Sequence, residues 1–250
     1  MKLINNYDST MFDDFRDIKQ KKPHLNNLFF IESYKVYLKA VNSKINILKT
    51  ITTKEVYESN PSKFNLGEVL ITTPEILEKL VKFKSHTKIF SIAKIPNEKI
   101  DFNKDIIFFN NITSPENVGA IIRSALAFDF SQVAYDKKSL TPWNRRSVRV
   151  STGNIFKFNS TRVFDSLNFL EICLKKDYEI IAMDNSPKAQ NINTIKIAKK
   201  KLIILGSEGH GISDDILNFS TTILKIPVSE YVKHLNVGHA AAITFHELSK

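Results

Sequence analysis

The final fifty residues constrain the fold more than any other part of this 250-residue chain. Residues 201–205 form a short apolar run, and three glycines and a carboxylate follow directly in residues 206–211. Ile226 and Pro227 end a second apolar run, after which residues 234–246 read as a loop and a helix that begins at asparagine. Loops that leave the same ends of buried strands form the ligand site in open α/β sheets. The stretch therefore predicts a small-molecule site.

Apolar strand-like runs alternate with helical patterns along most of the chain, which predicts an α/β fold. Residues 26–96 are expected to form a small α/β domain, and residues 105–250 a larger one with a mainly parallel sheet. Residues 1–25 are polar and are expected to form a tail, and the polar residues 97–104 a linker. Within the second domain, strands are expected at 105–109, 132–135, 155–158, 179–183, 202–205 and 222–226.

The chain is basic, with a formal net charge of +10 and a pI of about 9.5. Such a charge favours a polyanionic partner such as RNA, although a solvated lysine-rich surface would give the same number. The single cysteine, Cys173, lies in an apolar helical pattern and is expected in the core, so no disulfide can form within the chain. We find no apolar leader and no run of membrane-spanning length, and we expect a cytoplasmic protein without a membrane partner.

A second informative segment follows the apolar run 105–109. Asn117 can cap the helix that begins there, and Gly119 allows its first turn to approach another backbone or a ligand closely. Arg123 then projects near the loop-facing end of this helix. Further along, a basic segment contains a single indole followed by three arginines, which either line a nucleic-acid channel or form a charged helix face: Arg145, Arg146 and Arg149.

Two other functions are disfavoured by the residues themselves. The glycines of residues 206–211 lack the Gly-Lys-Ser/Thr ending of a phosphate-binding loop, which disfavours a nucleotide hydrolase. His234, His239 and His246 have no cysteine or carboxylate set at ligand spacing, so we expect no metal site.

Three segments together resemble the SpoU (TrmH-like) RNA 2′-O-ribose methyltransferases of the SPOUT class. They are residues 111–123, residues 206–211, and residues 226–227 with the Leu235-Asn236-Val237 loop and the alanine-rich helix after it. The resemblance covers about residues 105–250. More loosely, residues 26–96 resemble the α/β RNA substrate-binding domain often found ahead of this catalytic domain.

The resemblance implies a trefoil-knotted domain, a homodimer, S-adenosylmethionine as cofactor, and rRNA or tRNA as substrate, with rRNA favoured. It assigns catalysis to Arg123, Asn117, Glu208 and Asn236. It assigns cofactor binding to Leu205, Gly206, Gly211, Ile226, Leu235, Asn236 and Ala240. RNA contacts are expected from Arg123, Arg145, Arg146, Arg149 and His234.

The chain departs from the family pattern at several positions of these motifs. His234 and Gly238 stand where serines are usual, and Asn110 stands where an aspartate is common ahead of the first motif. An alternative therefore stays open, in which the chain is a catalytically impaired SpoU-like RNA-binding protein.

Overall fold

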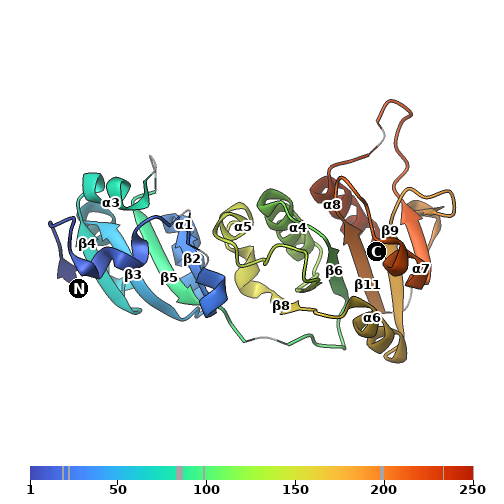
Figure 1. Ribbon diagram of the computed structural model, residues 1–250, viewed down its shortest axis with the longest axis horizontal. Helices are drawn as coiled ribbons and strands as arrows, with labels where there is room; N and C mark the ends of the chain where they lie inside the picture. The colour runs from blue at the N-terminus through green and yellow to red at the C-terminus, as the bar shows by residue number, and fades with distance from the viewer. Residues whose placement is uncertain are drawn as a thin grey trace. The chain divides into compact units, whose positions relative to one another are not determined.

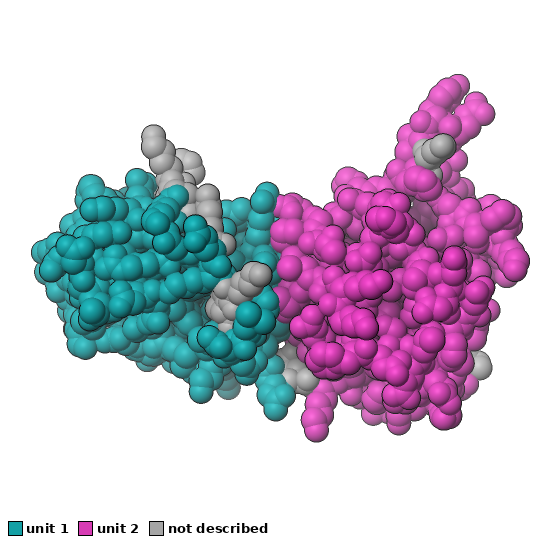
Figure 2. All heavy atoms as spheres, in the orientation of Figure 1, with its two compact units in different colours: residues 1–97, 143–156 teal, residues 98–142, 157–250 magenta. Residues whose placement is uncertain are grey.

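The computed structural model describes residues 1–18, 20–21, 23–82, 87–97, 99–197, 200–232 and 234–249. It divides into two compact units, which Figure 2 distinguishes by colour. The first consists of Met1–Asn97 and Trp143–Phe156, and the second of Glu98–Pro142 and Lys157–Lys250.

The first unit is built on a five-stranded mixed sheet (Figure 1). Its strands are β1 (Lys2–Leu3), β2 (Leu28–Glu32), β3 (Ile47–Thr53), β4 (Glu68–Thr72) and β5 (Ile89–Lys94), in the order β1-β4-β3-β5-β2. The pairs β1–β4 and β3–β4 are parallel, whereas β5 runs antiparallel to both β3 and β2. Its helices are α1 (Tyr34–Asn42), α2 (Lys54–Ser59) and α3 (Pro74–Val81). Thr73 caps α3, because its side chain accepts from the Ile76 amide. Pro74 follows it in the first turn of the helix.

The expected polar tail is wrong, because residues 1–18 belong to the first unit. Strand β1 pairs with β4, and a 3₁₀ helix at Thr10–Phe15 places Phe12 and Phe15 in the core, both with no exposed surface. Ile18 is also buried in the same cluster. Three apolar side chains at three-residue spacing supply enough buried surface to fix this segment despite its polar composition. Lys19 and Lys22 lie outside the described residues.

The expected second domain also loses a segment, since residues 143–156 pack with the first unit. Helix α5 (Arg145–Val150) contacts β2, and Trp143 lies 4.7 Å from the Phe29 ring, measured between ring centroids. The strand expected at 155–158 is instead a 3₁₀ turn at Asn154–Lys157, with Phe156 stacked near the indole. This aromatic cluster explains the assignment, because it buries large apolar surfaces from both segments.

The second unit is a seven-stranded sheet in which every pair is parallel. Its strands are β6 (Ile106–Asn110), β7 (Gln132–Tyr135), β8 (Asn159–Arg162), β9 (Tyr178–Met183), β10 (Gln190–Asn191), β11 (Lys200–Gly206) and β12 (Thr222–Lys225). The order is β10-β12-β9-β11-β6-β7-β8. The chain builds outward from β6 to β8 and then crosses back to β9, so the strand order reverses beside β6 and β11. The mainly parallel sheet predicted for this region is therefore confirmed.

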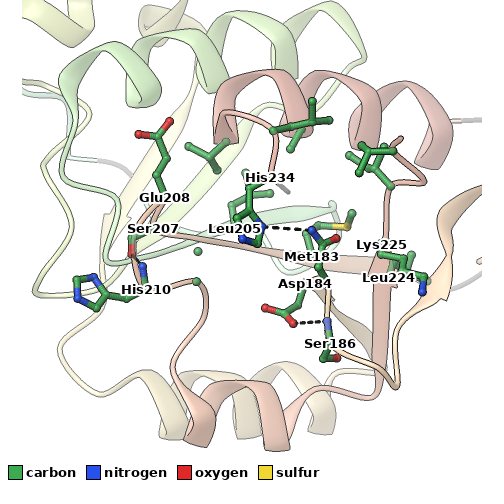
Figure 3. Close-up of a pocket in the computed structure, with 18 of the residues that line it drawn as sticks. Met183, Asp184, Ser186, Leu205, Ser207, Glu208, His210, Leu224, Lys225 and His234 are labelled. Carbon is green, nitrogen blue, oxygen red and sulfur yellow. Dashed lines mark hydrogen bonds between the residues drawn. The ribbon is translucent and has the colours of Figure 1, made fainter. Parts of the chain in front are cut away.

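Helices cover both faces of this sheet, which is why its central strands are apolar throughout. The helices α4 (Pro115–Ala127) and α8 (Val237–Leu248) pack together on one face, and α6 (Ser166–Lys175) and α7 (Asp214–Phe219) on the other (Figures 1 and 3). Cys173 is fully buried in the α6 layer, as predicted. No helix in the described ranges is long and apolar enough to cross a membrane.

Residues 99–104 of the expected linker 97–104 pack on the second unit, where Gln132, Tyr178 and Lys200 donate hydrogen bonds to their carbonyls. Glu98 lies outside the described residues. The amide of Gln132, 1% exposed, donates to the carbonyls of Asp101 and Lys104 at 2.8 and 3.1 Å. Its oxygen accepts from the Asp101 amide at 2.9 Å. A buried amide needs these partners, so the segment that supplies them packs against the strand.

Candidate active site

The glycine-rich segment after β11 forms a tight loop whose two ends touch. The Ser207 amide donates to the Gly211 carbonyl at 3.0 Å, and the Gly211 amide donates back at 2.9 Å. A Cβ on Gly206 would lie 2.4 Å from the Gly211 carbonyl carbon, and Gly211 has a φ of +65°. Both positions therefore require glycine, the first for close backbone approach and the second for its backbone conformation. Gly209, with nothing within 4 Å of an added Cβ, has no such requirement.

A cavity of about 490 Å³ opens beside this loop, at the ends of β9, β11 and β12 (Figure 3). Six of the seven residues expected to bind a cofactor line it: Leu205, Gly206, Gly211, Ile226, Leu235 and Ala240. The seventh, Asn236, does not line the cavity but binds Glu208, which does. The volume lies within the range of small-molecule sites, about 300–1,000 Å³.

One wall of the cavity was not anticipated from the sequence. It is formed by Met183, Asp184, Asn185 and Ser186, where β9 ends. The Asp184 amide donates to the Leu224 carbonyl at 2.9 Å, and its carboxylate accepts from the Ser186 amide at 2.8 Å. Figure 3 shows this pair facing the loop after β11. The sequence did offer a signal for this wall, since the polar residues 184–186 directly follow an apolar run. Because β9 is parallel to β11, the residues after both strands lie at the same edge of the sheet.

Three residues from the three motif segments meet at the rim of the cavity. The side-chain amide of Asn236 donates to the Asn117 side-chain oxygen at 3.0 Å and also to the Glu208 carboxylate. The side-chain oxygen of Asn236 accepts from the Gly238 amide at 2.8 Å and caps α8, as the sequence predicted. These residues are separated by 28 and 119 positions in the chain, so their contact is made by the fold.

The cap of α4 differs from the prediction. Ser114 caps this helix and accepts from the Asn117 amide, and Pro115 occupies the first turn. Asn117 therefore lies inside the helix, 7% exposed, with its side chain directed to Asn236. A residue expected to serve the helix end instead serves the contact between α4 and α8.

Gly238 is explained by the packing of α4 on α8. A Cβ at this position would lie 3.1 Å from the Ala120 Cβ, closer than side chains normally approach. The absence of a side chain lets the two helices meet directly above Asn236. The glycine found in place of the usual serine is thus a packing residue in this chain.

The residues expected to contact RNA occupy different places. Arg123 is exposed on α4, about 9 Å along the helix axis from Asn117, and is not among the described residues that line the cavity. His234 lines the cavity, and its Nδ1 lies 3.4 Å from the Asn185 side-chain nitrogen. Arg145 and Arg149 both donate to the buried carboxylate of Glu32 within the first unit, whereas the side chain of Arg146 is exposed. Across the described ranges, no cluster of three or more histidine, cysteine or carboxylate side chains is placed to hold a metal.

The chain matches known proteins over most of its length. A chain from Borreliella burgdorferi named as an uncharacterized tRNA/rRNA methyltransferase is 29% identical over 81% of this chain and 95% of its own. A 23S rRNA (guanosine(2553)-2′-O)-methyltransferase of Bacillus subtilis is 23% identical over 99% of both chains. These relatives span both units of the fold.

Solved structures share the whole architecture at low sequence identity. An rRNA methyltransferase from Sinorhizobium meliloti with bound AdoMet superposes with a TM-score of 0.86 at 18% identity, covering 98% of this chain and 96% of that one. The SpoU methyltransferase AviRb from Streptomyces viridochromogenes, in complex with AdoMet, gives 0.83 at 17% identity, covering 96% and 98%. The model of the SpoU rRNA Methylase family matches residues 104–246, more than half of the sequence. The chain belongs to the SpoU rRNA methylase family.

Proposed function

We propose that this protein transfers a methyl group from S-adenosylmethionine to a ribose 2′-hydroxyl of RNA, with rRNA favoured over tRNA. The observation that carries the proposal is the junction of Asn117, Glu208 and Asn236 at the rim of the cavity. Three motifs that are far apart in sequence supply one constellation beside a cavity of cofactor size. The separate first unit supports an rRNA substrate, because recognition of a folded RNA requires surface beyond the catalytic unit.

The cavity fits the proposed cofactor in size and in the chemistry of its walls. The loop that Gly206 and Gly211 close presents backbone at the cavity wall, and the Asp184 and Glu208 carboxylates suit a cationic group or the amino edge of an adenine. Ser186 adds a buried hydroxyl oxygen without a hydrogen-bond partner in the described residues. When bound, S-adenosylmethionine supplies a methyl group activated by a positively charged sulfur.

The residues of the chain would then orient the hydroxyl and stabilise its developing charge. Arg123 is assigned this role, because a guanidinium remains protonated and is better suited to stabilise an alkoxide than to remove its proton. Asn236 holds Glu208 and the first turn of α4 in one arrangement, which makes it a positioning residue. His234, at the mouth of the cavity, is assigned to the RNA side of the site.

The remaining parts of the proposal follow from the family. They are a trefoil knot in the second unit, a homodimer, an RNA-binding role for the first unit with Arg145, Arg146 and Arg149, and a cytoplasmic location, where such RNA is available.

The deciding experiment maps 2′-O-methyl groups in total rRNA and tRNA from cells with and without the gene. We expect one mark to disappear, to return with the wild type and with Lys175→Ala, an exposed cation on α6, and not to return with Arg123→Ala. Removal of one group that stabilises transition-state charge lowers the rate by about 10²–10³. Calorimetry should show unchanged cofactor affinity in Arg123→Ala. An unaltered set of marks together with cofactor binding would refute the activity and favour an impaired RNA-binding protein.

A further inference from the structure

A second cavity, of about 820 Å³, lies in the same unit where β6, β7 and β8 end. It shares His210 and Gly211 with the first cavity, so the loop after β11 separates two neighbouring hollows. None of the motifs that identify the family is needed to form its far side. That side is made by Lys137 and Lys138 after β7 and by residues 164–167 after β8.

The most unusual residue of this second cavity is Phe164, whose side chain is 76% exposed. The Arg162 guanidinium lies 5.8 Å from the centre of its ring, and the same guanidinium donates to the Lys137 carbonyl at 3.0 Å. The arginine thus joins the aromatic ring to the lysine-bearing segment. An exposed ring beside cations is the arrangement with which proteins stack bases of single-stranded nucleic acid.

Charge is distributed unevenly around the second cavity. Lys137 and Lys138 are exposed on one side, whereas Asp165 and Asp215 are exposed where α6 and α7 begin. The pKa of Asp215 lies below its ordinary value, mainly because the Ser213 side chain hydrogen-bonds to it, with a smaller contribution from the charge of Lys138. The carboxylates disfavour an isolated phosphate and accept hydrogen bonds from amino groups on base edges.

The third carboxylate of this cavity is not available to a ligand. Asp136 is 5% exposed, and its oxygens accept from the Asn110 side chain at 3.1 Å and from the Ser139 amide at 2.7 Å. It therefore fixes the floor of the cavity. The groups left to face a ligand are an aromatic ring, two lysines and two exposed carboxylates, a set that matches a nucleotide better than a simple anion.

We propose that the second cavity binds a nucleobase of the RNA strand next to the nucleotide being methylated. The base stacks on Phe164, and the adjoining backbone phosphate lies at Lys137 and Lys138. This inference rests on the proposed function for the identity of the ligand as RNA. The wall shared with the first cavity explains how one strand reaches both: the target ribose faces the first cavity while its neighbour enters the second.

The test compares binding of two single-stranded RNAs about 12 nucleotides long, one with bases and one made of abasic ribose phosphate. Phe164→Ala should weaken binding of the base-bearing RNA by about 5- to 100-fold, the range for loss of one stacked base, and leave the abasic strand unchanged. Leu174→Ala, which removes another exposed apolar side chain from α6, is the matched control and should change neither. Lys138→Ala should weaken binding of both RNAs alike and lower the slope of log affinity against log salt concentration by about one.

Equal binding by Phe164→Ala and Leu174→Ala would overturn the proposal, as would an equal loss for both RNAs in Phe164→Ala. The binding readout does not depend on turnover. A Phe164-dependent preference for bases in a protein that methylates no RNA would therefore refute the proposed activity while supporting the second cavity as a base site.

Discussion

The carboxylate of Glu32 provides the sharpest test of how the first unit is held together. Its side chain is 2% exposed and accepts from Arg145 and, at 3.1 Å, from Arg149. Arg145 is 18% exposed and Arg149 is 44% exposed, so the first pair is largely withdrawn from water and the second is not. These contacts join β2 to residues 143–156, which are remote in sequence.

The expected losses of folding stability follow from this difference in burial. Among the ion pairs of the described residues, Arg145→Ala leaves the buried carboxylate with the half-exposed Arg149, and removal of one member of a buried pair costs about 3–5 kcal/mol. Glu32→Gln keeps the shape but replaces charge-assisted hydrogen bonds with neutral ones, which costs roughly 2 kcal/mol. Arg149→Ala removes a screened pair and should cost below about 1 kcal/mol.

The single tryptophan offers a probe confined to this unit. Trp143 is 2% exposed and packs in one cluster with the rings of Phe29 and Phe156, so its fluorescence reports unfolding of the first unit. In thermal melts we expect Arg145→Ala to lower the midpoint by on the order of 10 °C, Glu32→Gln by less, and Arg149→Ala by a few degrees. Unchanged transitions for all three variants would refute the ion-pair reasoning. Weaker RNA binding by such variants would then assign the arginines to RNA instead.

Two further predictions concern the second unit. Gly206→Ala should abolish cofactor binding in calorimetry, because its Cβ would overlap the Gly211 backbone at 2.4 Å, whereas Gly209→Ala should bind normally; equal affinities would contradict the close-approach argument. Burial raises the pKa of Cys173 to about 12, from 9.0, so the folded state keeps the thiol proton that the unfolded state releases. The contribution of Cys173 to the free energy of unfolding should therefore be constant below about pH 8 and fall above about pH 9, by up to ~1.4 kcal/mol per pH unit. Urea titrations of the wild type and Cys173→Ala check this, and an equal pH dependence in both would contradict it.

Much of the second unit and its site could be predicted from the sequence because the signals there are local. Continuous apolar runs such as residues 202–205 indicate strands buried on both faces, and parallel strands bring their following loops to one edge. The glycines at 206 and 211 and the asparagine at 236 stand directly at those strand and helix ends. Six residues expected around a cofactor accordingly line one cavity.

The features that were missed depend on partners far away in the chain. The ion pairs of Arg145 and Arg149 were not predicted, because the buried carboxylate that accepts from them lies 113 and 117 residues earlier. Phe12 and Phe15 stand in a polar segment, and only the sheet of the first unit shows what buries them. The assignment of Ser114 rather than Asn117 as a cap is a choice between two good capping residues that tertiary contact decides.

The departure at Asn110 is explained by the two hydrogen bonds that its side-chain amide makes. Asn110 is 6% exposed, donates to Asp136 at 3.1 Å and accepts from the Ser213 amide at 2.9 Å. An aspartate at this position would place two carboxylates in contact in a buried site, where like charges cannot both remain ionised at low cost. With Asp136 present, the amide is the side chain that satisfies both neighbours. It ties the end of β6 to the segment leaving the glycine loop, beneath the wall that the two cavities share, so the substitution preserves the scaffold of the site.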